Sequence, residues 1–63
     1  MPIIEVSLLE GRSKEKKLAL IKALTEAAVV SLDAPIESVR VILREMPLEH
    51  YGIAGKTKAS VDH

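Results

Sequence analysis

Hydrophobic and polar residues alternate at the start of the chain, over residues 2–9. One set of alternate positions is apolar throughout and comprises Ile4, Val6 and Leu8, whereas the other set mixes apolar and polar side chains. Successive side chains of a strand point to opposite faces. The pattern therefore predicts a strand with one core face and one mixed face, which would meet another subunit or a polar channel.

The spacing of apolar residues changes to three and four over residues 14–32, which predicts a long amphipathic helix. Ser13 is a suitable N-cap. Asp33-Ala34-Pro35 should end the helix, because the residue before a proline disfavours helical backbone angles. We expect the inward stripe to consist of Leu18, Ile21, Thr25, Ala28 and Leu32, flanked by Leu20, Leu24 and Val29.

Alternation returns over residues 38–46, where Val39, Val41 and Leu43 would form the core face of a second strand. Strand, helix and strand make a βαβ unit, whose two strands run parallel with a right-handed crossover. Beyond it, the glycine-flanked segment 52–55 indicates a tight turn or short hairpin, and residues 56–63 read as a polar, loosely held tail. The predicted fold class is α+β.

The chain of 63 residues allows one domain, expected over residues 2–63, and a domain this small removes only about 60% of its unfolded surface from water. It has no cysteine, so disulfides cannot compensate, yet 48% of its residues are hydrophobic. Two strands under one helix also leave both sheet edges open to another chain. We therefore expect the sheet to be completed by neighbouring subunits in a homo-oligomer.

Charge and composition exclude two classes of binding partner, nucleic acid and membrane. The net charge is zero and Tyr51 is the only aromatic residue, so neither a basic stripe nor a stacking platform for nucleic acid is present. No apolar run is long enough to span a membrane, and no basic-then-apolar leader opens the chain. We expect a cytoplasmic protein that binds neither nucleic acid nor membrane.

Pro2 is the first candidate for chemistry, because removal of Met1 would give it a free secondary amine held by its ring and by the strand behind it. An α-amino group ordinarily has a pKa of about 7.7–8.0. Apolar neighbours and nearby guanidinium groups would lower the pKa of the Pro2 amine, which suits a general base at neutral pH. A proline at this position otherwise simply permits methionine removal.

The arginines are the second candidates, since the planar guanidinium fork binds carboxylates in bidentate fashion. Arg12 follows the first predicted strand and Arg40 begins the second, so a parallel pair would hold them at opposite ends of the sheet. Two chains could bring both to one ligand more easily than one chain could. Arg12, Arg40 and Arg44 could equally be solvated surface charges.

Other polar residues give weaker signals. His50 reads as an ordinary loop residue, and Glu5 and Glu10 suit surface or ion-pair roles better than an acid–base pair. The sequence contains no phosphate-binding glycine loop, no nucleophilic serine motif and no cluster of metal ligands.

The sequence also resembles a known family, the 4-oxalocrotonate tautomerases, from Pro2 to about Gly55 without gaps. The segments that carry the resemblance are Pro2-Ile3, Leu9-Glu10-Gly11-Arg12-Ser13, Ser31-Leu32-Asp33-Ala34-Pro35, Ser38-Val39-Arg40-Val41-Ile42, Glu45-Met46 and His50-Tyr51-Gly52-Ile53. The resemblance implies a βαβ unit with a C-terminal hairpin, assembled as a hexamer that is a trimer of dimers. It further implies a keto–enol tautomerase of aromatic catabolism, acting on small dienol dicarboxylates such as 2-hydroxymuconate, without cofactor or metal.

The same resemblance implies roles for five residues. Pro2, free of Met1, would take a proton from the 2-hydroxyl side of the substrate and return it at carbon 5. Arg40 would stabilise charge at the keto end and Arg12 would bind the far carboxylate, both from neighbouring chains, while Leu9 and Tyr51 would line the pocket. Tyr51 stands where the family commonly has phenylalanine.

Two alternatives stay open on the same scaffold. One is a dehalogenase or decarboxylase of small acids, which usually needs an extra carboxylate to activate water, and only Glu10 and Glu49 lie in suitable loops. The other is a non-catalytic oligomeric module that binds small acids, which a retained Met1 would favour.

Overall fold

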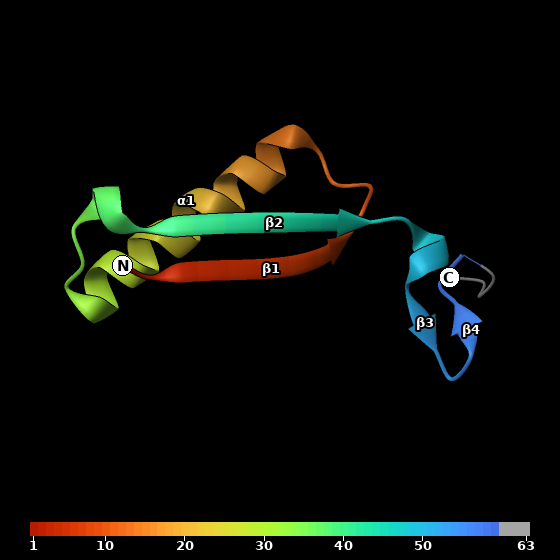
Figure 1. Cartoon of the computed structure of the whole chain (residues 1–63). Helices are drawn as coiled ribbons and strands as arrows, with labels where there is room; N and C mark the ends of the chain where they lie inside the picture. Colours follow the sequence, from red (N-terminus) through yellow and green to blue (C-terminus); the bar gives the residue numbers. More distant parts are fainter. Residues whose placement is uncertain (60–63) are drawn as a thin grey trace.

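The computed structural model describes residues 1–59 and confirms the predicted α+β arrangement of a βαβ unit followed by a hairpin (Figure 1). Strand β1 (Ile3–Leu9) leads into helix α1 (Lys14–Leu32), which crosses one face of the sheet, and strand β2 (Arg40–Met46) then returns beside β1. A short 3-10 helix, η1 (Ile36–Ser38), joins α1 to β2.

The two long strands are parallel, with Ile3 opposite Arg40 and Leu9 opposite Met46. Backbone hydrogen bonds close the ladder at both ends: the Arg40 N–H donates to the Pro2 carbonyl at 3.0 Å, and the Glu10 N–H donates to the Met46 carbonyl at 3.0 Å. Within the described chain the sheet contains only these two strands, so each keeps one open edge.

The second strand begins two residues later than the alternation predicted. Ser38 belongs to η1 instead, where its N–H and its hydroxyl both donate to the Pro35 carbonyl, at 3.0 and 2.7 Å. These local bonds compete with the ladder for the backbone of residue 38. The first strand likewise begins at Ile3 rather than Pro2, although Pro2 still accepts a ladder bond through its carbonyl.

Helix α1 has the bounds that the sequence predicted. The Ser13 hydroxyl oxygen accepts a hydrogen bond from the Lys16 N–H at 3.2 Å, which satisfies one of the unpaired donors of the first turn. At the other end Asp33 takes a left-handed conformation with φ of 56°, and Pro35 follows two residues later. Both features end the helical hydrogen-bond pattern.

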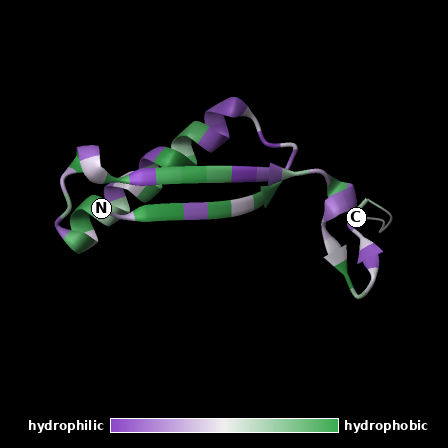
Figure 2. Cartoon of the chain, viewed as in Figure 1, coloured by the Kyte–Doolittle hydropathy of each residue, from purple (hydrophilic) through white to green (hydrophobic). Residues whose placement is uncertain are grey.

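The core is small. Among residues 1–59, Ala28 is the only apolar residue that one chain encloses fully, with 6% of its surface exposed. Figure 2 shows hydrophobic residues recurring along both strands and the helix. Leu18 and Leu32, predicted to face inward, are each 63% exposed, because a sheet of two strands covers a narrower arc of the helix than the apolar stripe occupies.

The C-terminal hairpin confirms the turn predicted at residues 52–55. Strands β3 (Gly52–Ile53) and β4 (Lys56–Thr57) follow a second 3-10 helix, η2 (Leu48–His50), and project beyond the far end of β2 (Figure 1). The prediction of a loose tail is wrong for Lys56 and Thr57, which pair in this hairpin. It is also wrong for Lys58, whose N–H donates to the Tyr51 carbonyl, and the part of the prediction over residues 60–63 lies outside the described residues.

Candidate active site

Pro2 and Arg40 lie together at the end of the sheet where both long strands begin. Pro2 is half-buried, and its carbonyl accepts the Arg40 N–H. The strand ladder thus fixes the backbone of both residues side by side. An amine on Pro2 would lie at the N-terminal end of β1, with its direction set by the proline ring and by the strand that follows.

The Arg40 side chain belongs to the face of the sheet that α1 does not cover. On β2, Glu45 pairs with Lys17 of α1, so odd-numbered positions face the helix and Arg40, at an even position, faces away. The Arg40 Nη1 donates to the carbonyl of Glu37 at 2.6 Å and, more weakly, to that of Val39 at 3.4 Å. The exposed guanidinium keeps further donors for an anion.

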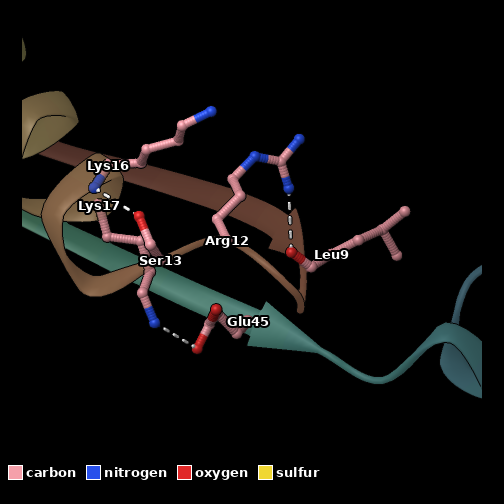
Figure 3. A network of polar contacts seen from close by, with 6 residues as sticks. All are labelled: Leu9, Arg12, Ser13, Lys16, Lys17 and Glu45. Carbon is pink, nitrogen blue, oxygen red and sulfur yellow. Dashed lines mark hydrogen bonds and ion pairs between the residues drawn. The ribbon is translucent and has the colours of Figure 1, made fainter.

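Arg12 lies at the opposite end of the sheet, in the loop between β1 and α1. Gly11 supplies the positive φ of 118° on which this loop turns. The Arg12 Nη1 donates to the Leu9 carbonyl at 3.1 Å (Figure 3). The seven residues of β1 separate the Arg12 loop from Pro2 by about 20 Å, which confirms the prediction that Arg12 and Arg40 occupy opposite ends.

The two predicted wall residues belong to the Arg12 end. Leu9 is half-buried at the last position of β1. Tyr51 is 40% exposed and stands at the entrance to the hairpin, where its carbonyl accepts the Lys58 N–H at 2.8 Å. One chain therefore gathers Arg12 and Leu9 on one side and Pro2 and Arg40 on the other.

Two ion pairs were missed by the sequence reasoning. Lys17 Nζ lies 3.1 Å from Glu45 Oε1, and Arg44 Nη2 lies 3.1 Å from Glu5 Oε2. The first had a signal: alternation along the second strand places Glu45 on the face that carries Val41 and Leu43, where a carboxylate needs a partner.

The described residues form no group of three or more His, Asp or Glu side chains that could hold a metal ion. No pocket is enclosed by residues 1–59 of one chain. None of the described helices is long and apolar enough to cross a membrane.

Comparison with known proteins establishes the class. A family model described as "Tautomerase enzyme" matches residues 2–60, so the chain belongs to the tautomerase family and is an isomerase of that type. It is 57% identical over 60 residues to a probable tautomerase of Ralstonia nicotianae, a match that spans 95% of this chain and 86% of the relative.

Two further comparisons find similar proteins with more specific names. The chain is 52% identical over 62 residues to a 2-hydroxymuconate tautomerase of Pseudomonas putida, which spans 98% of each protein. Among solved structures, a heterohexameric 4-oxalocrotonate tautomerase from Chloroflexus aurantiacus J-10-fl superposes with a TM-score of 0.91 at 37% identity, covering 98% of this chain and 100% of that one.

Proposed function

We propose that the chain, once Met1 is removed, catalyses keto–enol tautomerisation of an unsaturated dicarboxylate such as 2-hydroxymuconate, with the Pro2 amine as base and acid. The observation that carries the proposal is the placement of Pro2: half-buried, at the opening of β1, and bonded through its carbonyl to the backbone of Arg40. The likeness to a Pseudomonas putida 2-hydroxymuconate tautomerase supports the substrate class.

The proposed reaction moves one proton within the substrate. The neutral Pro2 amine takes the proton from the 2-hydroxyl, the electron pair shifts along the conjugated chain, and the resulting ammonium returns a proton to carbon 5. Atoms and charge balance without a cofactor. Arg40 would stabilise the negative charge that develops at the keto end, and Arg12 would hold the distant carboxylate.

The two ends of the sheet must then come from different chains. About 20 Å of strand separates Pro2 from Arg12 in one chain, more than an arginine side chain can bridge. Arg40 differs, because its backbone already adjoins Pro2 in the same chain. We therefore propose that the Pro2 end of one subunit meets the Arg12, Leu9 and Tyr51 end of another.

We further propose a homohexamer built as a trimer of dimers. The support is apolar surface that one chain leaves exposed, on the helix-free sheet face at Ile3 (55%) and Ile42 (40%) and on α1 at Leu18 (63%) and Val30 (83%). A related protein from Chloroflexus aurantiacus J-10-fl is heterohexameric. Burial of such surface between subunits contributes about 25 cal/mol per Å².

The test compares the wild type with Pro2→Ala on 2-hydroxymuconate and phenylenolpyruvate, using protein whose intact mass shows loss of Met1. We expect Pro2→Ala to lose most isomerase activity while keeping its assembly state. A short uncleaved extension before Pro2 should do the same, because an amide nitrogen is not basic, whereas the same extension at the C-terminus should be tolerated. Full activity in Pro2→Ala would refute the proposal.

A further inference from the structure

An ion pair between Lys17 and Glu45 ties the start of α1 to the end of β2 (Figure 3). The nitrogen and oxygen are 3.1 Å apart, and the two side chains are 29% and 36% exposed, so the pair is partly sheltered from water. It is therefore better protected from screening than the Arg44–Glu5 pair, whose side chains are 61% and 49% exposed.

The loop that carries Arg12 is held between this pair and a second anchor. On its β1 side, the Glu10 N–H donates to the Met46 carbonyl. On its α1 side, Lys17 reaches Glu45, the neighbour of Met46 on the same strand. Both ends of the loop are thus fastened to consecutive residues of β2, and the Arg12 backbone lies between the two fastenings.

The position of Lys17 is otherwise unfavourable. It stands in the first turn of α1, where the helix dipole disfavours a positive charge, and Glu15 is the only acidic residue of that turn. Lys16 stands in the same turn, and no ion pair involves its side chain among residues 1–59. A partner on β2 therefore distinguishes Lys17 from its neighbour and makes Lys16 a matched control.

We propose that Lys17 and Glu45 are positioning residues that hold the Arg12 loop against β2 and so set the affinity for the second carboxylate of the substrate. This inference rests on the proposed function. Lys17 and Glu45 pair with each other, and in Figure 3 the Arg12 guanidinium is directed away from the pair, so the pair would act on Arg12 through the loop backbone.

The experiment measures kcat and KM of Lys17→Met and Glu45→Gln on a dicarboxylate, 2-hydroxymuconate, and a monocarboxylate, phenylenolpyruvate. The free energy of a partly exposed pair corresponds to an increase of about twofold to fivefold in KM for the dicarboxylate. We expect kcat on the dicarboxylate and both constants on the monocarboxylate to stay at wild-type values. Lys16→Met should behave as wild type on both substrates, and the charge reversal Lys17→Glu with Glu45→Lys should restore KM.

A double-mutant cycle with Arg12→Ala makes the test specific. If Lys17 acts through Arg12, Lys17→Met should add nothing to the KM of Arg12→Ala. Equal losses on both substrates, or additive losses in the cycle, would overturn the inference while Pro2-dependent turnover left the proposed function standing. Turnover that persists unchanged in Pro2→Ala would instead count against the proposed function.

Discussion

Mixing two impaired variants provides the sharpest test of a site shared between subunits. The perturbation is a pair of single substitutions, Pro2→Ala in one preparation and Arg12→Ala in the other, unfolded together and refolded at equal concentration. Each chain of the mixture carries one of the two substitutions, so neither holds both residues intact. Pro2 and Arg12 lie at opposite ends of β1 in one chain, and if they meet across a subunit boundary, a boundary between the two kinds of chain holds both.

The expected recovery follows from counting. In a randomly mixed symmetric assembly, half of the sites have an intact Pro2 and half of those meet an intact Arg12 from the neighbour, so about one quarter of the sites are complete. Loss of a charge-assisted hydrogen bond costs about 1.5–3 kcal/mol, which lowers kcat/KM of the Arg12→Ala parent by about tenfold to hundredfold. Recovery to about one quarter of wild-type activity therefore stands clear of both parents.

The assay follows 2-hydroxymuconate turnover at low substrate concentration, with each parent refolded alone as the control. A mixture that equals the average of its parents would refute the shared site, since it would mean that Pro2 and Arg12 never meet across a boundary. Mixing Pro2→Ala with Arg40→Ala asks the same of Arg40. Recovery there would place Arg40 in a neighbouring chain despite the backbone bond that joins it to Pro2 within one chain.

Two predictions concern stability and assembly. Ser13→Ala removes the oxygen that caps the Lys16 N–H and should lower the free energy of unfolding by about 1 kcal/mol. This corresponds to a fall of about 4–8 °C in Tm, measured by circular dichroism at fixed protein concentration. The control Ser31→Ala loses only an intrahelical bond to the Ala27 carbonyl and should leave Tm unchanged or slightly raised. Ile42→Lys places a charge on the helix-free sheet face and should lower the mass of the assembly by light scattering; an unchanged mass would show that this face is not an interface.

Local patterns predicted most of the fold. Alternation marked both strands, and the cap at Ser13 and the proline at position 35 bounded α1 to the residue. The start of β2 was misplaced because the Ser38 N–H and hydroxyl both donate to the Pro35 carbonyl. These bonds depend on side-chain geometry rather than on hydrophobic period. The hairpin was predicted from its glycines, but its second strand was missed, since the two residues Lys56 and Thr57 are too few to show a period.

For the candidate site, the sequence predicted where the two arginines lie along the sheet. Chain order and parallel topology sufficed to separate Arg12 from Arg40, because a parallel pair has only one possible sense. The Lys17–Glu45 and Arg44–Glu5 ion pairs escaped, since each joins residues far apart in the chain and depends on the register of β1 against β2 and on where α1 crosses the sheet. A sequence pattern specifies neither that register nor where the helix crosses the sheet.

The helix residues that were wrongly predicted to face inward also bear on the site. Leu18 and Leu32 were assigned inward because their spacing matches Ile21 and Ala28, yet one chain leaves them exposed. The pattern describes a helix that is apolar over a wider arc than two strands can cover, and the proposed assembly would bury the apolar surface that remains. Two copies joined antiparallel along open strand edges would place the Pro2 end of each beside the Arg12 end of the other. In such an assembly the surface that completes the core would also complete the site, and loss of assembly should abolish turnover.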